Sequence, residues 1–121
     1  MINSQVLDKA IAAHAAWKAR LRKTASTGTC DVASTKADNQ CDLGKWLYGT
    51  ELSTEEKQST HYRTVKQLHA EFHKEVARIV DLATSGQKGA AEAALGMDSK
   101  YVEISSTLTA ALVKWRDGLA L

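Results

Sequence analysis

Two histidines stand four residues apart in the segment His69-Ala70-Glu71-Phe72-His73. Residues at this spacing on an α-helix project from the same side, so both imidazoles can reach one ion. A histidine pair at this spacing also occurs on surface helices that bind nothing. The spacing alone therefore permits a metal site without requiring one.

Two more residues of metal-ligand type lie earlier in the chain. His14 falls on the apolar face of a periodic segment, and Cys41 opens the short segment 41–49. Because an isolated buried imidazole is costly to desolvate, several near one core favour a shared partner. Zinc binds neutral imidazole and thiolate in a tetrahedral shell, which three histidines and one cysteine complete. The residues thus favour a Zn²⁺ site at His69 and His73, with His14 and Cys41 as candidates for the other two ligands.

A catalytic zinc ion is disfavoured by the residues around the histidine pair. Zinc proteases place glutamate directly after the first histidine, where it acts as a base. Ala70 holds that position here, and Glu71 would point to the opposite side of the helix. Four protein ligands would also leave no coordination position for a water molecule. We therefore predict that the chain is not an enzyme.

Two other residues are weaker candidates for a role in metal binding. His61 lies eight residues before His69 and could share its helix face, although a surface histidine is the simpler interpretation. Cys30 lies in a polar stretch, where an exposed thiol without a special role is favoured. Trp17 and Trp46 are interpreted as core aromatics that could also shield a metal from water.

The elements that would position these residues are helical, since the chain has no proline and its glycines fall mainly between periodic segments. Apolar residues recur every three or four positions over 4–24, and glycine ends a short helix over 41–49. A hydroxyl at Ser53 or Thr54 followed by glutamates predicts the start of a helix that runs to Thr84. The last helix is predicted over 88–117, with a kink at Gly96.

These segments predict an all-α fold, an antiparallel four-helix-bundle-like domain with three long helices and one short helix that carries Cys41. The stretch 25–40 reads as a long loop. Residues 1–121 are expected to form one domain, because the length suits one and no repeat is present. The expected inward positions of the last helix are Met97, Tyr101, Ile104, Leu108, Ala111 and Trp115.

The composition and charge of the chain bear on its binding partners and its cellular compartment. Hydrophobic residues make up 44% of the chain and charged residues 25%, with a formal net charge of +2. This small, interleaved positive charge argues against a nucleic-acid partner. The chain shows neither a signal peptide nor a membrane-length apolar run, so we expect a cytoplasmic protein. A reducing compartment argues against a disulfide between Cys30 and Cys41.

The chain resembles the chemoreceptor zinc-binding domain family over nearly its whole length. The Cys-x-Leu-Gly-x-Trp core, with histidines on either side in the right order, is the specific part of the resemblance. Three motifs carry it: His14-Ala15-Ala16-Trp17-Lys18, Cys41-Asp42-Leu43-Gly44-Lys45-Trp46-Leu47-Tyr48-Gly49 and His69-Ala70-Glu71-Phe72-His73.

The resemblance implies a helical-bundle domain of bacterial signalling proteins, which binds zinc through three histidines and one cysteine. It carries the ligand roles over to His14, Cys41, His69 and His73. It also implies sensing of zinc or of oxidants such as hypochlorous acid, a homodimer, and a fused or separate effector. That effector would be a chemoreceptor signalling region or a diguanylate cyclase. The alternative is a structural zinc site in a helical dimerisation module.

Overall fold

The computed structural model describes residues 4–28, 37 and 41–119. This part of the chain forms helices and turns and contains no strand, so the all-α prediction is confirmed. The predicted loop over 25–40 lies mostly outside the described residues, as does Cys30. The described elements are α1 (Ser4–Thr27), α3 (Asp42–Tyr48), the 3₁₀ turn η1 (Glu56–Gln58), α4 (Thr60–Thr84), α5 (Lys88–Ala94) and α6 (Lys100–Leu119).

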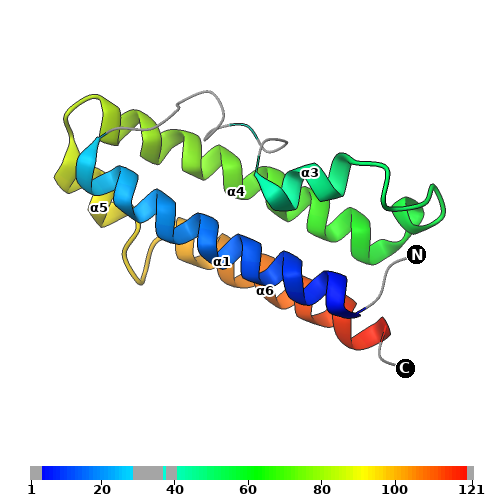
Figure 1. The fold of residues 1–121 in the computed structure, drawn as a ribbon. Helices are drawn as coiled ribbons and strands as arrows, with labels where there is room; N and C mark the ends of the chain where they lie inside the picture. The colour runs from blue at the N-terminus through cyan, green and yellow to red at the C-terminus, as the bar shows by residue number, and fades with distance from the viewer. Residues whose placement is uncertain (1–3, 29–36, 38–40, 120–121) are drawn as a thin grey trace.

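Three long helices, α1, α4 and α6, pack lengthwise against one another (Figure 1). α1 and α4 run in one direction and α6 in the other, so the start of α1 and the end of α6 lie at the same end (Figure 1). The short α3 packs against α1 and α4, while α5 contacts the same two helices at the opposite end. The short helix that follows Cys41 is therefore present and lies beside the two helices that carry the histidines.

The core lies between the long helices and continues under α3. Apolar side chains at three- and four-residue spacing face inward from each long helix, as the sequence pattern predicts. The residues with no exposed surface include Leu7, Leu47, Val65, Phe72, Val76, Ile79, Val80, Leu108 and Leu112. Much of this core lies far along the helices from Cys41, so the bundle has a large apolar interior of its own.

The start of α4 was predicted too early. Ser53 and Glu56 do form reciprocal capping hydrogen bonds, from Ser53 N–H to Glu56 Oε1 (2.9 Å) and from Glu56 N–H to Ser53 Oγ (3.1 Å). These bonds hold only the turn that leads into η1, because the backbone of Ser59 is extended (φ −68°, ψ 152°) and interrupts the helix. The Ser59 side chain then accepts from Tyr62 N–H and caps α4 itself.

The last predicted helix is two helices. α5 ends at Ala94 and α6 begins at Lys100, so the region of Gly96 is a break rather than a kink. Met97 lies in this break and is 91% exposed, so its predicted inward position is wrong. Tyr101, Leu108 and Trp115 are buried as predicted, and Leu112 is buried where Ala111 is only partly so.

α1 ends at a glycine in the left-handed region. Gly28 has φ +73°, and its N–H donates to the Thr24 carbonyl at 2.8 Å. A side chain is strained at this φ, which makes glycine the residue that terminates helices in this way. Separately, none of the helices in the described part is both long and apolar enough to cross a bilayer.

Candidate metal centre

Cys41 is positioned by the start of α3. It is the N-cap residue of that helix, and its Sγ accepts a hydrogen bond from Gly44 N–H at 3.3 Å. Leu43 and Leu47 on α3 are buried and anchor the short helix to the core. The Cys41 side chain is buried, with 8% exposure, and is a free thiol.

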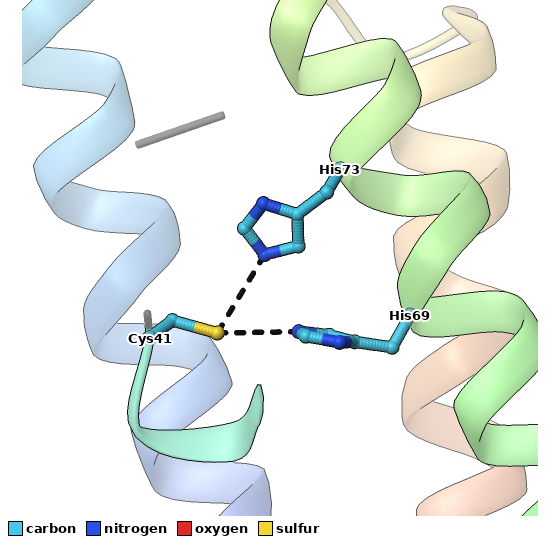
Figure 2. Close-up of side chains that lie close together, drawn as sticks. All are labelled: Cys41, His69 and His73. Atoms are coloured by element: carbon cyan, nitrogen blue, oxygen red, sulfur yellow. Dashed lines mark hydrogen bonds between the residues drawn. The ribbon is translucent and has the colours of Figure 1, made fainter. Parts of the chain in front are cut away.

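His69 and His73 project from successive turns of α4 toward this thiol (Figure 2). Cys41 Sγ lies 3.2 Å from His69 Nε2 and 3.6 Å from His73 Nε2. Both imidazoles are buried, with 1% and 3% exposure, and their ring centroids are 4.7 Å apart. The helix spacing read from the sequence is therefore realised with both rings turned to one sulfur atom.

These three side chains fit a zinc ion. One ligand atom from each lies within 4.8 Å of the others, and no other such group of three or more occurs among the described residues. In a tetrahedral site with ordinary Zn–S and Zn–N bond lengths, sulfur and nitrogen ligands are about 3.6 Å apart. The two sulfur–nitrogen distances here are at or slightly below that value. The donor set of thiolate and imidazole is also the one that zinc prefers.

Burial decides the protonation of Cys41 in the metal-free protein. Removal of the thiol from water raises its pKa, while hydrogen bonds from the backbone of Gly44 and Leu43 lower it in part. The net direction is upward, so the metal-free side chain is a thiol at neutral pH. A metal must therefore displace a proton from Cys41, which makes zinc affinity increase with pH.

His14 lies beside this group but outside it. It is buried on α1, with 4% exposure, and its ring packs edge-on against Phe72 with centroids 4.8 Å apart. Its Nε2 lies 3.1 Å from Ser105 Oγ on α6. The group within 4.8 Å contains only Cys41, His69 and His73 among the described residues, so the fourth predicted ligand stays a prediction.

Aromatic side chains surround the histidines. Trp17 contacts the His73 ring edge-on at a centroid distance of 4.9 Å. In this position the indole can shield the His73 side of the site from water. Trp46 instead packs against Trp115 at 5.5 Å, so its contact joins α3 to the end of α6. His61 is exposed and stacks on the same Trp115 ring, as expected of a surface histidine. Glu71 is also exposed, as its place on the helix predicted.

Ser105 lies beside the site and is not among the residues predicted from the sequence. It is 1% exposed and lies in the buried row of α6 between Tyr101 and Leu108. The sequence pattern predicts Ile104 as the inward residue of this turn, whereas Ile104 is only partly buried. A serine one helical turn after a buried tyrosine and three residues before a buried leucine is the signal that could have identified it.

The pKa of His14 leads to a prediction about stability. Burial chiefly, then the positive charge of Lys18 and the neighbouring His73, lower the pKa of His14 from 6.5 to about 4. The unfolded chain therefore binds a proton at His14 before the folded chain does. The lowered pKa reduces the free energy of unfolding of the metal-free protein only at low pH. We expect no such loss above pH 6.5, and a loss of up to about 3 kcal/mol as the pH falls to 4.

Urea unfolding of metal-free protein at pH 7 and pH 4 measures this loss. His14→Gln, which cannot titrate, should show a clearly smaller difference between the two pH values than wild type. An equal difference in both proteins would contradict the assignment to His14.

The fold and this site define a class of protein, a small all-α domain with a buried cysteine–histidine metal centre. Residues 14–80, more than half of the chain, match the chemoreceptor zinc-binding domain. The chain therefore belongs to this family of zinc-binding domains from signalling proteins, and Zn²⁺ is its metal. The matched range begins at His14 and includes all four predicted ligands. Neither the curated proteins nor the solved structures gave a significant match.

Proposed function

We propose that this domain is a zinc-dependent regulatory module whose occupancy responds to zinc or to oxidants. The observation that carries the proposal is the position of one buried thiol, Cys41, between two imidazole nitrogens at 3.2 and 3.6 Å. A site with one thiolate among neutral ligands depends on that residue for its negative charge. The proposed ligands are His14, Cys41, His69 and His73.

The residues around α3 support a link between Cys41 chemistry and a change in conformation. At its C-terminal end α3 is held by Tyr62, whose hydroxyl donates to the Leu47 carbonyl at 2.8 Å, and by Lys57, whose Nζ donates to the Gly49 carbonyl at 2.7 Å. At its N-terminal end, Cys41 is what approaches the α4 histidines. When bound, zinc would hold the Cys41 thiolate against α4. Release of that end frees α3 to move about its C-terminal anchor.

The oxidation of Cys41 by hypochlorous acid is a balanced two-electron step. The thiolate sulfur bonds to the oxygen of hypochlorous acid as the O–Cl bond breaks; the proton stays on that oxygen to give a sulfenic acid, and chloride leaves. Sulfur is oxidised and chlorine is reduced. A sulfenic acid is a poorer and uncharged ligand, so Cys41 no longer binds the metal well.

A movement of α3 can be transmitted to α6 through a contact between two tryptophans. Trp46 on α3 packs against Trp115 near the end of α6, so movement of α3 alters the packing of that helix end. We propose that a chemoreceptor signalling region or a diguanylate cyclase, fused or separate, responds to this change. The family also supports a homodimer and a place in the cytoplasm, where Cys41 stays reduced.

The test is zinc release under oxidation. Purified protein is expected to carry one zinc ion per chain by elemental analysis and to release it when stoichiometric hypochlorous acid oxidises Cys41, as mass spectrometry records. Its helical circular dichroism should be mostly kept, because the apolar core extends well beyond the site. A thiol reductant should restore zinc binding.

Two outcomes would count against the proposal. Retention of zinc after proven oxidation of Cys41 would remove the oxidant response. Unfolding of the bundle when a chelator removes zinc would instead favour a structural zinc site in a dimerisation module, the alternative function.

A further inference from the structure

Ser105 is a polar residue in an otherwise apolar row. The buried residues of α6 are Tyr101, Ser105, Leu108, Leu112 and Trp115, and Ser105 alone among them is a short aliphatic alcohol. Its hydroxyl is fully enclosed, with 1% exposure. Burial of a hydroxyl at a position that an apolar residue could fill is costly unless the hydroxyl has a hydrogen-bond partner.

That partner comes from another helix. Other hydroxyls inside the helices bond to the carbonyl four residues earlier, as Thr24 does to Arg20, Thr84 to Val80 and Thr107 to Glu103. Ser105 Oγ instead lies 3.1 Å from His14 Nε2, across the bundle on α1. The hydroxyl is therefore used to contact this imidazole rather than to satisfy its own helix.

Phe72 holds the same ring from another side. The His14 and Phe72 rings meet edge-on at 4.8 Å, and Phe72 stands one residue before His73 on α4. The ring of His14 is thus fixed by a hydrogen bond to α6 and by an aromatic contact with the helix that carries the histidine pair. A histidine held in this way has one nitrogen committed to Ser105 and one remaining.

We propose that Ser105 is a positioning residue of the zinc site, which accepts a hydrogen bond from His14 Nε2–H and leaves Nδ1 as the ligand atom. Metal-binding histidines generally donate their second ring N–H to such a partner, which selects the tautomer and the ring orientation. The proposal rests on the proposed function, because it takes His14 as the fourth ligand. The proposed ligands come from α1, from α4 and from the N-cap of α3. With Ser105, α6 also contributes a residue that orients one of these ligands.

The first experiment reads the tautomer of His14 in metal-free protein by ¹⁵N NMR of the imidazole nitrogens. We expect the Nε2–H form in wild type and in Ser105→Thr, which keeps a hydroxyl, and a loss of that preference in Ser105→Ala. Ser106→Ala is the matched control, because Ser106 is exposed on the same helix. An Nδ1–H tautomer in wild type, or a tautomer unaffected by Ser105→Ala, would overturn the proposal.

The second experiment measures zinc affinity by competition with a chromophoric chelator. Ser105→Ala is expected to weaken zinc binding by about 10- to 100-fold, the usual effect of losing a partner of a metal-binding histidine. Ser106→Ala should bind as wild type does, and Ser105→Thr should recover most of the loss. Unchanged or tighter binding in Ser105→Ala would overturn the role of Ser105.

His14→Ala separates this inference from the proposed ligand set. If that variant binds zinc as tightly as wild type, His14 is not a ligand and the four-ligand site itself is wrong. If His14→Ala binds weakly while Ser105→Ala binds normally, the ligand set stands and only the role of Ser105 fails.

Discussion

Replacement of Cys41 by alanine is expected to weaken zinc binding by about 100-fold or more. The change removes the only thiolate of the site, whereas loss of an indirect partner of a ligand already costs about 10- to 100-fold. It also removes the sulfur that lies 3.2 and 3.6 Å from His69 and His73, and leaves only the imidazoles of the proposed ligand set. The remaining proposed ligands, His14, His69 and His73, are neutral and supply no negative charge to balance that of the zinc ion.

The fold should survive this substitution. Cys41 is the N-cap of α3, and loss of its hydrogen bond from Gly44 N–H costs about 1 kcal/mol. That is small beside the stability of a domain of this size, about 5–15 kcal/mol. Circular dichroism should therefore remain helical while chelator competition records the loss of affinity.

Cys30→Ala is the matched control for this prediction. It removes the chain's other cysteine, which is not among the predicted ligands. Zinc affinity equal to that of wild type is expected for Cys30→Ala. A Cys41→Ala protein that binds zinc as tightly as Cys30→Ala would show that the buried thiol is not a ligand.

Replacement of Phe72 by alanine is expected to lower the free energy of unfolding by about 3–5 kcal/mol. Phe72 has no exposed surface and lies at the centre of the bundle. Its ring contacts His14 at 4.8 Å, Tyr101 at 5.3 Å and Trp17 at 5.5 Å, measured between centroids. The substitution therefore leaves a cavity and also removes these aromatic contacts, of which those with His14 and Trp17 are edge-on.

Urea unfolding of the metal-free protein measures this effect as a lower midpoint with an unchanged slope. Met97→Ala is the control, since it deletes a large apolar side chain that is 91% exposed and should shift stability by less than about 0.5 kcal/mol. Zinc affinity should fall in Phe72→Ala as well, because the Phe72 ring packs against the His14 ring and restricts its orientation. Equal stability of the two variants would contradict the central place of Phe72 in the core.

Local pattern determined several parts of this protein. The four-residue step from His69 to His73 is set by helix geometry, so their shared direction followed from spacing alone. The helical fold and the burial of Phe72 followed from apolar periodicity. The short helix after Cys41 could be predicted because the segment 41–49 has room for only about two helical turns and ends in a glycine.

Element boundaries were less predictable where two local signals competed. Ser53 and Glu56 do form the reciprocal hydrogen bonds of a capping pair, but these hold the turn before η1, and a second cap at Ser59 starts α4. The separation of α5 from α6 likewise leaves Met97 exposed. In both places the choice between one helix and two depended on packing against the rest of the bundle.

Contacts between helices were decided only by the tertiary structure. Helical spacing relates residues on one helix, whereas the approach of Cys41 to the α4 histidines depends on how α3 docks. The sequence also determined that His14 faces inward, but the fold decided that its Nε2 meets Ser105, 91 residues away. Such a contact depends on the relative rotation and translation of two packed helices, which neither helix encodes by itself.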